Sequence, residues 1–299
     1  MNILTVLVTG KGGQLATELE KTKPENVKLI CLSSKELDIT DNHQVNLVFK
    51  QYLPDIVINA AAYTAVDKAE SERDRAFAVN QKGCENLASV CKKFDSFLVH
   101  ISTDFVFDGT HSKPYQPYDL PCPISVYGES KLAGEQKVNQ ILACKALVVR
   151  TAWVYSAHGN NFVKTMLRLM AEKDQLSVIY DQVGTPTWAK GLARWLWVMS
   201  DKVNEIPCSD FTPIYHWTDA GVASWYDFAV AIQDLAIEKG MLSKAIPISP
   251  IETAQYPTPA KRPSFSLIDK ACAEAVSGMN TVHWRNQLNN MLDELNQLS

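Results

Sequence analysis

Tyr127 and Lys131 are the two residues whose types and spacing point to proton transfer. Residues four apart share one face of a helix, so the phenol and the ammonium group would be neighbours. A tyrosine with its ordinary pKa of about 10 is a poor acid or base near neutral pH, and an adjacent positive charge lowers that pKa. The spacing also arises by chance. It gains weight because the pair opens an expected helix 24 residues after Thr103, whose hydroxyl could bind a substrate carbonyl beside the tyrosine.

A glycine-rich segment precedes the first expected helix, and its pattern is that of a phosphate-binding turn. Gly10, Gly13 and Ala16 are spaced as G-x-x-G-x-x-A. Glycines allow backbone N–H groups to approach a pyrophosphate closely, and the start of a helix adds a partial positive charge. Ala16 is small enough for the helix to pack closely against a sheet. The strand–turn–helix context predicts dinucleotide binding, and a plain tight turn is the alternative.

The segment after the second expected strand bears on the choice of cofactor. An acidic residue there usually binds the adenosine ribose of NAD, but this chain has Ser33, Ser34 and Lys35. No carboxylate in this tripeptide would repel a 2′-phosphate, and Lys35 could attract one. The sequence therefore favours NADPH and leaves NADH open as a second cofactor. A polar loop without a binding role is the alternative.

The elements that would position these residues alternate between strand and helix. Short apolar runs predict strands at 4–9, 27–32, 56–59, 97–102 and 146–151, and the stretches between them predict helices at 14–21, 42–52, 73–93 and 127–140. The predicted fold is therefore α/β, a Rossmann-like doubly wound parallel sheet with a smaller C-terminal substrate-binding region. We expect residues 1–150 to form the dinucleotide-binding domain. Residues 151–299, with helices expected at 162–172, 190–203 and 225–239, would mainly bind substrate, with some segments returning to the core.

Composition narrows the function classes. With 29 basic and 33 acidic residues the net charge is −4, which provides no attraction to nucleic acid or to an anionic membrane. The seven cysteines lack a C-x-x-C pair and the six histidines are never three or four apart, so neither a disulfide framework nor a metal site is predicted. No targeting or membrane-spanning segment is evident, and a cytoplasmic protein is expected. Trp195, Trp197 and Trp225 are interpreted as packing residues.

Several longer motifs are similar to those of one known family. They are Pro54–Glu70, Ser102–Gly109, Val126–Glu135, Arg150–Tyr155, Asn161–Lys164, Asp181–Thr187 and Tyr256–Pro263. On these residues the chain resembles the extended short-chain dehydrogenase/reductase superfamily and, within it, the dTDP-4-dehydrorhamnose reductases. The resemblance covers nearly the whole chain. The glycine turn and the Tyr/Lys pair are shared by the superfamily, whereas the last two motifs and the alanine-rich part of the first are specific to these reductases.

The resemblance implies a reduction with NADPH as cofactor and a nucleotide sugar as substrate. Hydride would pass to C4 of dTDP-4-dehydro-6-deoxy-L-mannose, which gives dTDP-L-rhamnose. Tyr127 would protonate the alkoxide, Lys131 would tune the tyrosine and bind the nicotinamide ribose, and Thr103 would polarise the carbonyl. The implied cofactor-binding positions are Gly10, Gly13, Gln14, Leu15, Asp38, Ile39, Ala60, Ala61, Ala62 and Lys131. The implied substrate-binding positions are Thr64, Val66, Asp104, Trp153 and Arg262, the last against the diphosphate.

Three departures from the family pattern matter. Ala16 replaces the usual third glycine, and Phe105 stands where most members have tyrosine, so the hydrogen bond of that phenol is absent. Some members bind a divalent metal at a dimer interface through glutamates. Glu18 fits one such position, but Lys190 occupies the other. The sequence therefore predicts no metal and leaves a homodimer open.

Other functions remain open from the residues alone. Another dTDP-4-keto-6-deoxyhexose reductase or a sugar-nucleotide epimerase would carry a similar Tyr/Lys pair. A 4,6-dehydratase is disfavoured, because it needs a titrating glutamate after Asp104 and Phe105 stands there. The non-catalytic alternative is a dinucleotide-binding regulatory subunit, like that of methionine adenosyltransferase.

Overall fold

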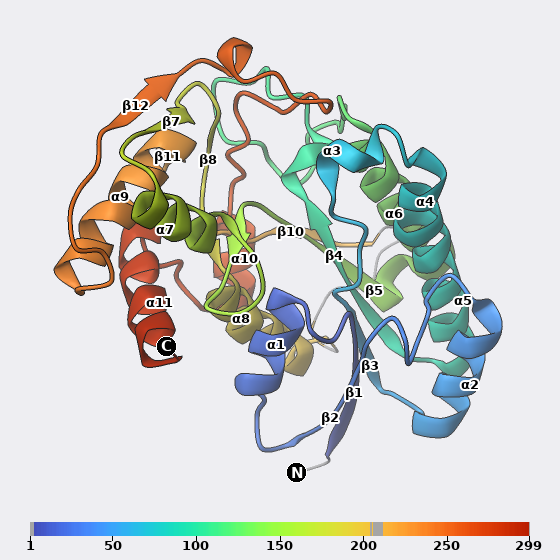
Figure 1. The fold of residues 1–299 in the computed structure, drawn as a ribbon. Coiled ribbons are helices and arrows are strands. Elements are labelled where there is room, and N and C mark those ends of the chain that lie inside the picture. Colours follow the sequence, from blue (N-terminus) through green and yellow to red (C-terminus); the bar gives the residue numbers. More distant parts are fainter. Residues whose placement is uncertain (1–2, 204, 206–211, 299) are drawn as a thin grey trace.

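A six-stranded parallel sheet forms the centre of the molecule (Figure 1). The computed structural model describes residues 3–203, 205 and 212–298. The strand order is β10-β5-β4-β3-β1-β2. The strands are β1 Leu4–Thr9, β2 Val27–Leu32, β3 Ile56–Asn59, β4 Phe97–Thr103, β5 Ala146–Thr151 and β10 Ile214–His216. Since β1 lies between β2 and β3, the order of the strands reverses beside it, and ligands of such sheets bind at the carboxyl edge near this reversal.

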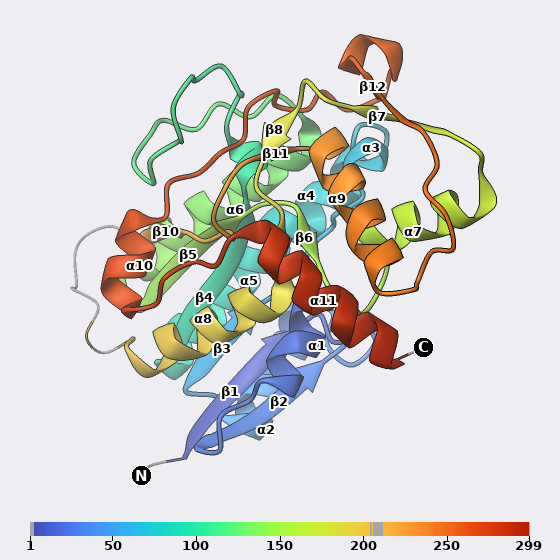
Figure 2. The ribbon, with the colours of Figure 1, turned by 90° about the vertical axis from the view of Figure 1, so that its left-hand side faces the viewer.

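Helices cover both faces of the sheet (Figures 1 and 2). They are α1 Gln14–Lys21, α2 Asn42–Tyr52, α3 Val66–Ala69, α4 Arg73–Phe77, α5 Gly83–Phe94, α6 Val126–Leu142, α7 Phe162–Glu172, α8 Ala189–Asp201, α9 Trp225–Glu238, α10 Ala271–Ser277 and α11 Trp284–Leu298. α1 and α8 pack on the face that Val6 and Val8 present, and α2, α5 and α6 pack on the face of Leu7. Successive strand residues point to opposite faces, so an unbroken apolar run fits a sheet buried on both sides.

The elements expected in the first half are largely confirmed, several of them to the residue. The helix expected at 73–93 is confirmed as one continuous helical run, with the difference that a π-helical segment at Ala78–Lys82 lies between α4 and α5. Within this segment, Asn80 exchanges hydrogen bonds with the backbone of Tyr63 at 2.8 and 3.1 Å and donates to the Ser130 hydroxyl at 2.9 Å. Such departures from the α-helix often mark functional places. Here Asn80 connects the loop after β3 to α6 through these hydrogen bonds.

The chain after β5 builds a second apolar core and also returns to the sheet. α7, α9 and α11 surround this core, in which Phe228, Ile232 and Leu288 are buried. The short strand pairs are β6 Val154–Tyr155 with β9 Thr187–Trp188, β8 Val183–Gly184 with β11 Ala223–Ser224, and β7 Leu176–Ile179 with β12 Ile248–Ile251. β10 pairs with β5, and α8 packs against α1 in the first core. The helices expected at 162–172, 190–203 and 225–239 are confirmed as α7, α8 and α9 with small shifts at their ends.

Three expectations from composition can be compared with the structure. No helix in the described ranges is long and apolar enough to cross a membrane. Trp195 and Trp197 are buried in the core, as expected of packing residues. Cys144 is in a disulfide, which the cysteine pattern did not predict.

Candidate active site

One pocket of about 900 Å³ opens at the carboxyl edge of the sheet, beside the second core. It brings together every residue that the sequence assigns to catalysis, cofactor binding or substrate binding. These are Gly10, Gly13, Gln14, Leu15, Asp38, Ile39, Ala60, Ala61, Ala62, Thr64, Val66, Thr103, Asp104, Tyr127, Lys131, Trp153 and Arg262. The pocket wall also includes residues that the sequence analysis does not assign, among them Lys11, Arg75, Asn160 and Trp225.

The glycine turn allows the loop after β3 to approach the start of α1. Gly10 has a φ of +82°, and a Cβ there would lie 3.0 Å from the backbone of Ala60 and Ala61. A Cβ on Gly13 would lie 3.0 Å from the carbonyl oxygen of Gly10. Gly13 also caps α1 without a side-chain hydrogen bond, so the first N–H groups of the helix remain available to an anion. This cradle fits the pyrophosphate of a dinucleotide.

Asp38 and Ile39, two of the predicted cofactor-binding residues, line the pocket after β2. The carboxylate of Asp38 accepts hydrogen bonds from the backbone and the hydroxyl of Thr40 at 2.9 and 2.8 Å, which fixes the turn after β2. Ile39 is buried against Gly83, where a Cβ would lie only 2.6 Å from the isoleucine side chain. The absence of a side chain on Gly83 therefore sets the position of Ile39 on the pocket wall.

The turn after β2 differs from the expectation that favours NADPH. Lys35 does not line the pocket, whereas Lys11 does, and the backbone N–H of Lys11 bonds to Leu32 at the end of β2 at 3.0 Å. A carboxylate also lies beside Ser33. The Glu36 side chain accepts hydrogen bonds from the backbone N–H and the hydroxyl of Ser33 at 2.9 and 2.6 Å. The candidate cation for a 2′-phosphate is therefore Lys11, which the sequence reasoning missed.

Tyr127 lies at the start of α6, half-buried in the pocket wall. Burial raises the pKa of its hydroxyl to about 12; a hydrogen bond with Thr103 lowers it and the charge of Asp104 raises it further. The ring packs edge-on against Phe105 with centroids 5.6 Å apart. In this structure the effect of burial on the tyrosine pKa therefore dominates, and the lowering of that pKa by Lys131 stays a prediction.

Lys131 is buried beneath the pocket, and its ammonium group donates to the carbonyl oxygen of Ile101 at 2.6 Å. Burial lowers the pKa of this lysine, while the nearby Cys84 and Glu135 oppose that effect. An ammonium group has three donors, and the Ile101 carbonyl takes one of them. The backbone of β4 thus aims the lysine, which keeps donors for ribose hydroxyls.

Thr103 and Asp104 follow each other at the end of β4. The Thr103 hydroxyl accepts from the backbone of Phe105 at 3.2 Å and donates to the Asp104 carboxylate at 3.0 Å. Asp104 is almost fully buried, and burial raises its pKa to about 6, against hydrogen bonds from Ser266 and Thr103 that lower it. The Thr103 hydroxyl thus contacts both the Asp104 carboxylate and the Tyr127 hydroxyl.

Trp153 and Trp225 form an aromatic wall in the pocket. Their rings are stacked with centroids 3.6 Å apart at 7°. Trp153 has a φ of +47°, an uncommon conformation for a tryptophan. Its ring lies so close to Gly184 that a Cβ there would come within 2.8 Å of it. The interpretation of Trp225 as a packing residue is incomplete, because it also lines the pocket.

Arg262 lines the pocket mouth and is held by groups of this chain. Its guanidinium donates to Asp67 at 2.7 Å, to the Thr258 hydroxyl at 2.5 Å and to the Ala260 carbonyl at 3.2 Å. The hydrogen bond from Arg262 lowers the pKa of Asp67, which keeps the pair ionised. The contact joins α3 to a segment almost 200 residues later, so Arg262 is positioned before any ligand contact.

A glycine turn after the first strand and a Tyr/Lys pair in the same pocket define the class as a Rossmann-type protein with the site of a short-chain dehydrogenase/reductase. Residues 4–297 match the family model of the RmlD substrate binding domain. The chain belongs to this family, the family of the dTDP-4-dehydrorhamnose reductases.

Individual relatives cover nearly the whole chain. A dTDP-4-dehydrorhamnose reductase of Aggregatibacter actinomycetemcomitans is 40% identical over 288 residues, which are 96% of this chain and 97% of the relative. A solved dTDP-4-dehydrorhamnose reductase of Clostridium acetobutylicum has a TM-score of 0.90 at 40% identity, covering 98% of this chain and all of the other. One of Bacillus anthracis, solved in complex with NADP, has a TM-score of 0.88 at 36% identity with the same coverage.

Proposed function

We propose that this protein is an NADPH-dependent oxidoreductase that reduces the C4 ketone of dTDP-4-dehydro-6-deoxy-L-mannose to dTDP-L-rhamnose. The observation that carries the proposal is that Thr103, Tyr127 and Lys131 share one pocket with the glycine turn. The relatives support the substrate by their names, and the Bacillus anthracis protein supports the cofactor. NADH stays open as a second cofactor.

The protein itself would supply the proton that completes the reduction, from the Tyr127 hydroxyl. Bound NADPH supplies the hydride, and reduction leaves an alkoxide that must be protonated. The pKa of Tyr127 is raised to about 12, so the phenol carries its proton at neutral pH. Since an alkoxide is a stronger base than a phenolate, transfer from Tyr127 is downhill. Burial of the tyrosine thus suits the reductive direction.

The neighbouring groups orient the reactants. We infer that the Thr103 hydroxyl turns from Asp104 to the substrate carbonyl, which would place that carbonyl beside the Tyr127 phenol. Lys131, aimed by the Ile101 carbonyl, would donate to the ribose of the cofactor. The stacked Trp153 would face the sugar, and Arg262 would meet the diphosphate with the N–H groups that its present partners leave over.

The remaining assignments follow the division of the chain into a dinucleotide-binding part and a substrate-binding part. Residues 1–150 would bind the dinucleotide, and residues 151–299 would mainly bind the nucleotide sugar while β10 and α8 complete the core. The glycine turn and the residues after β2 and β3 would hold NADPH. Thr64, Val66 and Asp104 would contact the sugar. A cytoplasmic location fits a biosynthetic reductase that uses soluble substrates, and a homodimer stays open.

A coupled assay tests the proposal. The purified protein should oxidise NADPH only when dTDP-4-dehydrorhamnose is supplied, and proton NMR coupling constants of the product ring should identify rhamnose rather than its C4 epimer. Protein denatured by heat is the control for chemical reduction. Tightly bound NAD in the purified protein together with no net oxidation of NADPH would contradict the proposal and point to an epimerase.

A further inference from the structure

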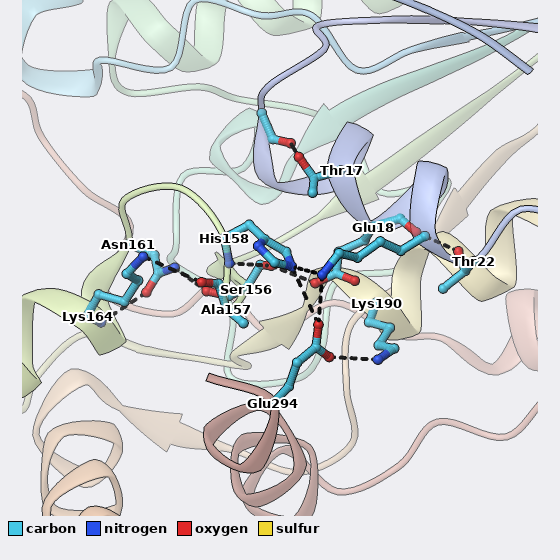
Figure 3. Close-up of polar contacts among 12 residues, drawn as sticks. Thr17, Glu18, Thr22, Ser156, Ala157, His158, Asn161, Lys164, Lys190 and Glu294 are labelled. Carbon is cyan, nitrogen blue, oxygen red and sulfur yellow. Dashed lines mark hydrogen bonds and ion pairs between the residues drawn. The ribbon is translucent and has the colours of Figure 1, made fainter. Parts of the chain in front are cut away.

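A cluster of charged side chains joins α1, the loop after β6 and α11 (Figure 3). Glu18, His158 and Glu294 each place one ligand-type atom within 4.8 Å of the others. Glu18 is fully buried, and one of its oxygens accepts from the Ser156 hydroxyl at 2.6 Å. Its other oxygen has no hydrogen-bond partner among the described residues. Carboxylates and imidazole are ligands that divalent metals accept, so the group must be tested as a metal site.

Two lysines already lie within this cluster. The ammonium group of Lys190 is 2.7 Å from one oxygen of Glu294, and that of Lys21 is 3.6 Å from the other (Figure 3 shows the first contact). Lys21 is also 2.6 Å from Nε2 of His158. An ammonium group only donates, so the imidazole nitrogen accepts and its lone pair is engaged.

The residues present do not fit a divalent metal. Both ammonium groups pair with Glu294, one at each of its oxygens, so this carboxylate already has cationic partners. A metal ion among the three ligand atoms would lie within a few ångströms of both lysines, and like charges at that distance repel strongly in a partly buried site. The imidazole nitrogen that faces the cluster is also engaged, by Lys21.

We propose that Lys21 and Lys190 take the place of a bound divalent cation and hold α11 onto α1. Lys21 lies at the end of α1 and Lys190 at the start of α8, while Glu294 lies on α11. The side chains of Lys190 and Glu294 are 23% and 16% exposed, so salt screens their attraction less than that of a surface pair.

The cluster also braces a wall of the active-site pocket. Ser156, which donates to Glu18, accepts from the Asn161 side chain through its backbone carbonyl at 2.6 Å. The same Asn161 amide donates to Gln14 at 2.9 Å, and Gln14 lines the pocket. Gly159, in the loop between these residues, lines it too. The position of this wall is therefore tied to the lysine–carboxylate cluster through a short series of hydrogen bonds.

The wild-type protein provides the first test. Thermal unfolding is measured in EDTA and in MnCl2, and Mn²⁺ binding is followed by electron paramagnetic resonance of the free ion. We expect the same Tm in both solutions and no binding below about 1 mM Mn²⁺, well above the dissociation constants of dedicated carboxylate sites. A lower Tm in EDTA, or tight Mn²⁺ binding, would overturn the proposal. These readouts involve no turnover, so they are independent of the proposed reductase activity.

The second test is Lys190→Glu, which replaces an ammonium group by a carboxylate beside Glu18 and Glu294. In EDTA its Tm should fall by several degrees, because like charges then face each other. Mn²⁺ should restore the Tm and bind at least about 10-fold more tightly than to the wild type, since the cluster gains a ligand and loses a cation. A folded variant without a Mn²⁺ response would overturn the proposal.

Lys239→Glu is the matched control. Lys239 pairs with Asp293 of α11 at 2.5 Å but lies outside the cluster. This variant should also lose stability, yet Mn²⁺ should not restore it. Should Lys190→Glu fail to fold, Lys190→Met provides the measurement, because it removes the ammonium group without adding a charge. An unchanged Tm in Lys190→Met would show that the lysine holds nothing together.

Discussion

A substitution of Asp104 tests the electrostatics of the pocket through protein stability, without an activity assay. The residue is 1% exposed, and burial raises the pKa of its carboxyl group from 3.8 to about 6. A rise of about two pKa units corresponds to about 3 kcal/mol that folding loses by burying the charge. Asp104→Asn removes the charge and keeps an oxygen that can accept from Thr103, so we expect a more stable protein.

The sign and the pH range follow from the two pKa values. Below about pH 4 the carboxyl group is protonated in both the folded and the unfolded chain, so the charge costs nothing. Above about pH 6 it is ionised in both states and the full cost applies. Asp104→Asn should therefore gain up to about 3 kcal/mol at neutral pH, or roughly 6 °C in Tm, and about half of that near pH 5.

Differential scanning calorimetry of both proteins at about pH 7.5 and pH 5 measures this difference. Asp108→Asn is a control of opposite sign, because hydrogen bonds from Tyr115 and Thr110 lower the pKa of Asp108, and the amide should cost stability at neutral pH. The reasoning is refuted by a fall in Tm of Asp104→Asn at neutral pH, or by an equal rise at both pH values.

The other predictions concern the ligands. Tyr127→Phe should lower kcat at least about 100-fold with little change in NADPH affinity, as for loss of a general acid, and turnover near the wild-type rate would exclude Tyr127 as the donor. Lys11→Ala should weaken NADP⁺ binding about 10-fold in calorimetric titrations and leave NAD⁺ binding unchanged; Lys35→Ala is the control, and a loss in that variant instead would restore the sequence-based assignment. Arg262→Ala should raise KM for the nucleotide sugar about 10- to 100-fold and leave that for NADPH unchanged, and equal losses for both ligands would indicate a folding defect. Asp67→Asn should act in the same direction but less, because Asp67 only positions the arginine, and an effect on NADPH alone would contradict that role.

The strands of the first half could be predicted because each is decided locally. Buried parallel strands are short apolar runs, and β1, β3 and β4 are such runs. β10 could not be predicted, since it has three residues and exists through its pairing with β5. α11 could have been found, because Trp284, Leu288, Met291 and Leu292 have the spacing of a buried helix face.

The candidate site likewise has residues that local sequence predicts and residues that only the fold brings into place. The glycine turn and the Tyr/Lys pair are close in sequence, so their spacing was sufficient to propose them. Lys11 was missed because it lies in the glycine turn after β1, and only the fold brings this turn to the end of β2, where the Lys11 N–H donates to Leu32. Trp225 is a packing residue as predicted, and its place in the pocket wall was missed because its stacking on Trp153 depends on the second core.

The pKa of a buried group depends on burial more than on the sequence spacing to a charged residue. Lys131 and Lys190 illustrate how much of a lysine's role is decided by the fold. Four residues separate Tyr127 from Lys131, yet burial raises the tyrosine pKa and the ammonium group is directed to a backbone carbonyl instead. At position 190 the sequence could show only that a lysine stands where some family members have a metal-binding glutamate. That Lys21 and Lys190 both pair with Glu294 depends on α1, α8 and α11 meeting in the fold. A lysine at position 190 is therefore stabilising only together with Glu294, and the same lysine in a chain lacking that glutamate would be a cation without a counter-charge.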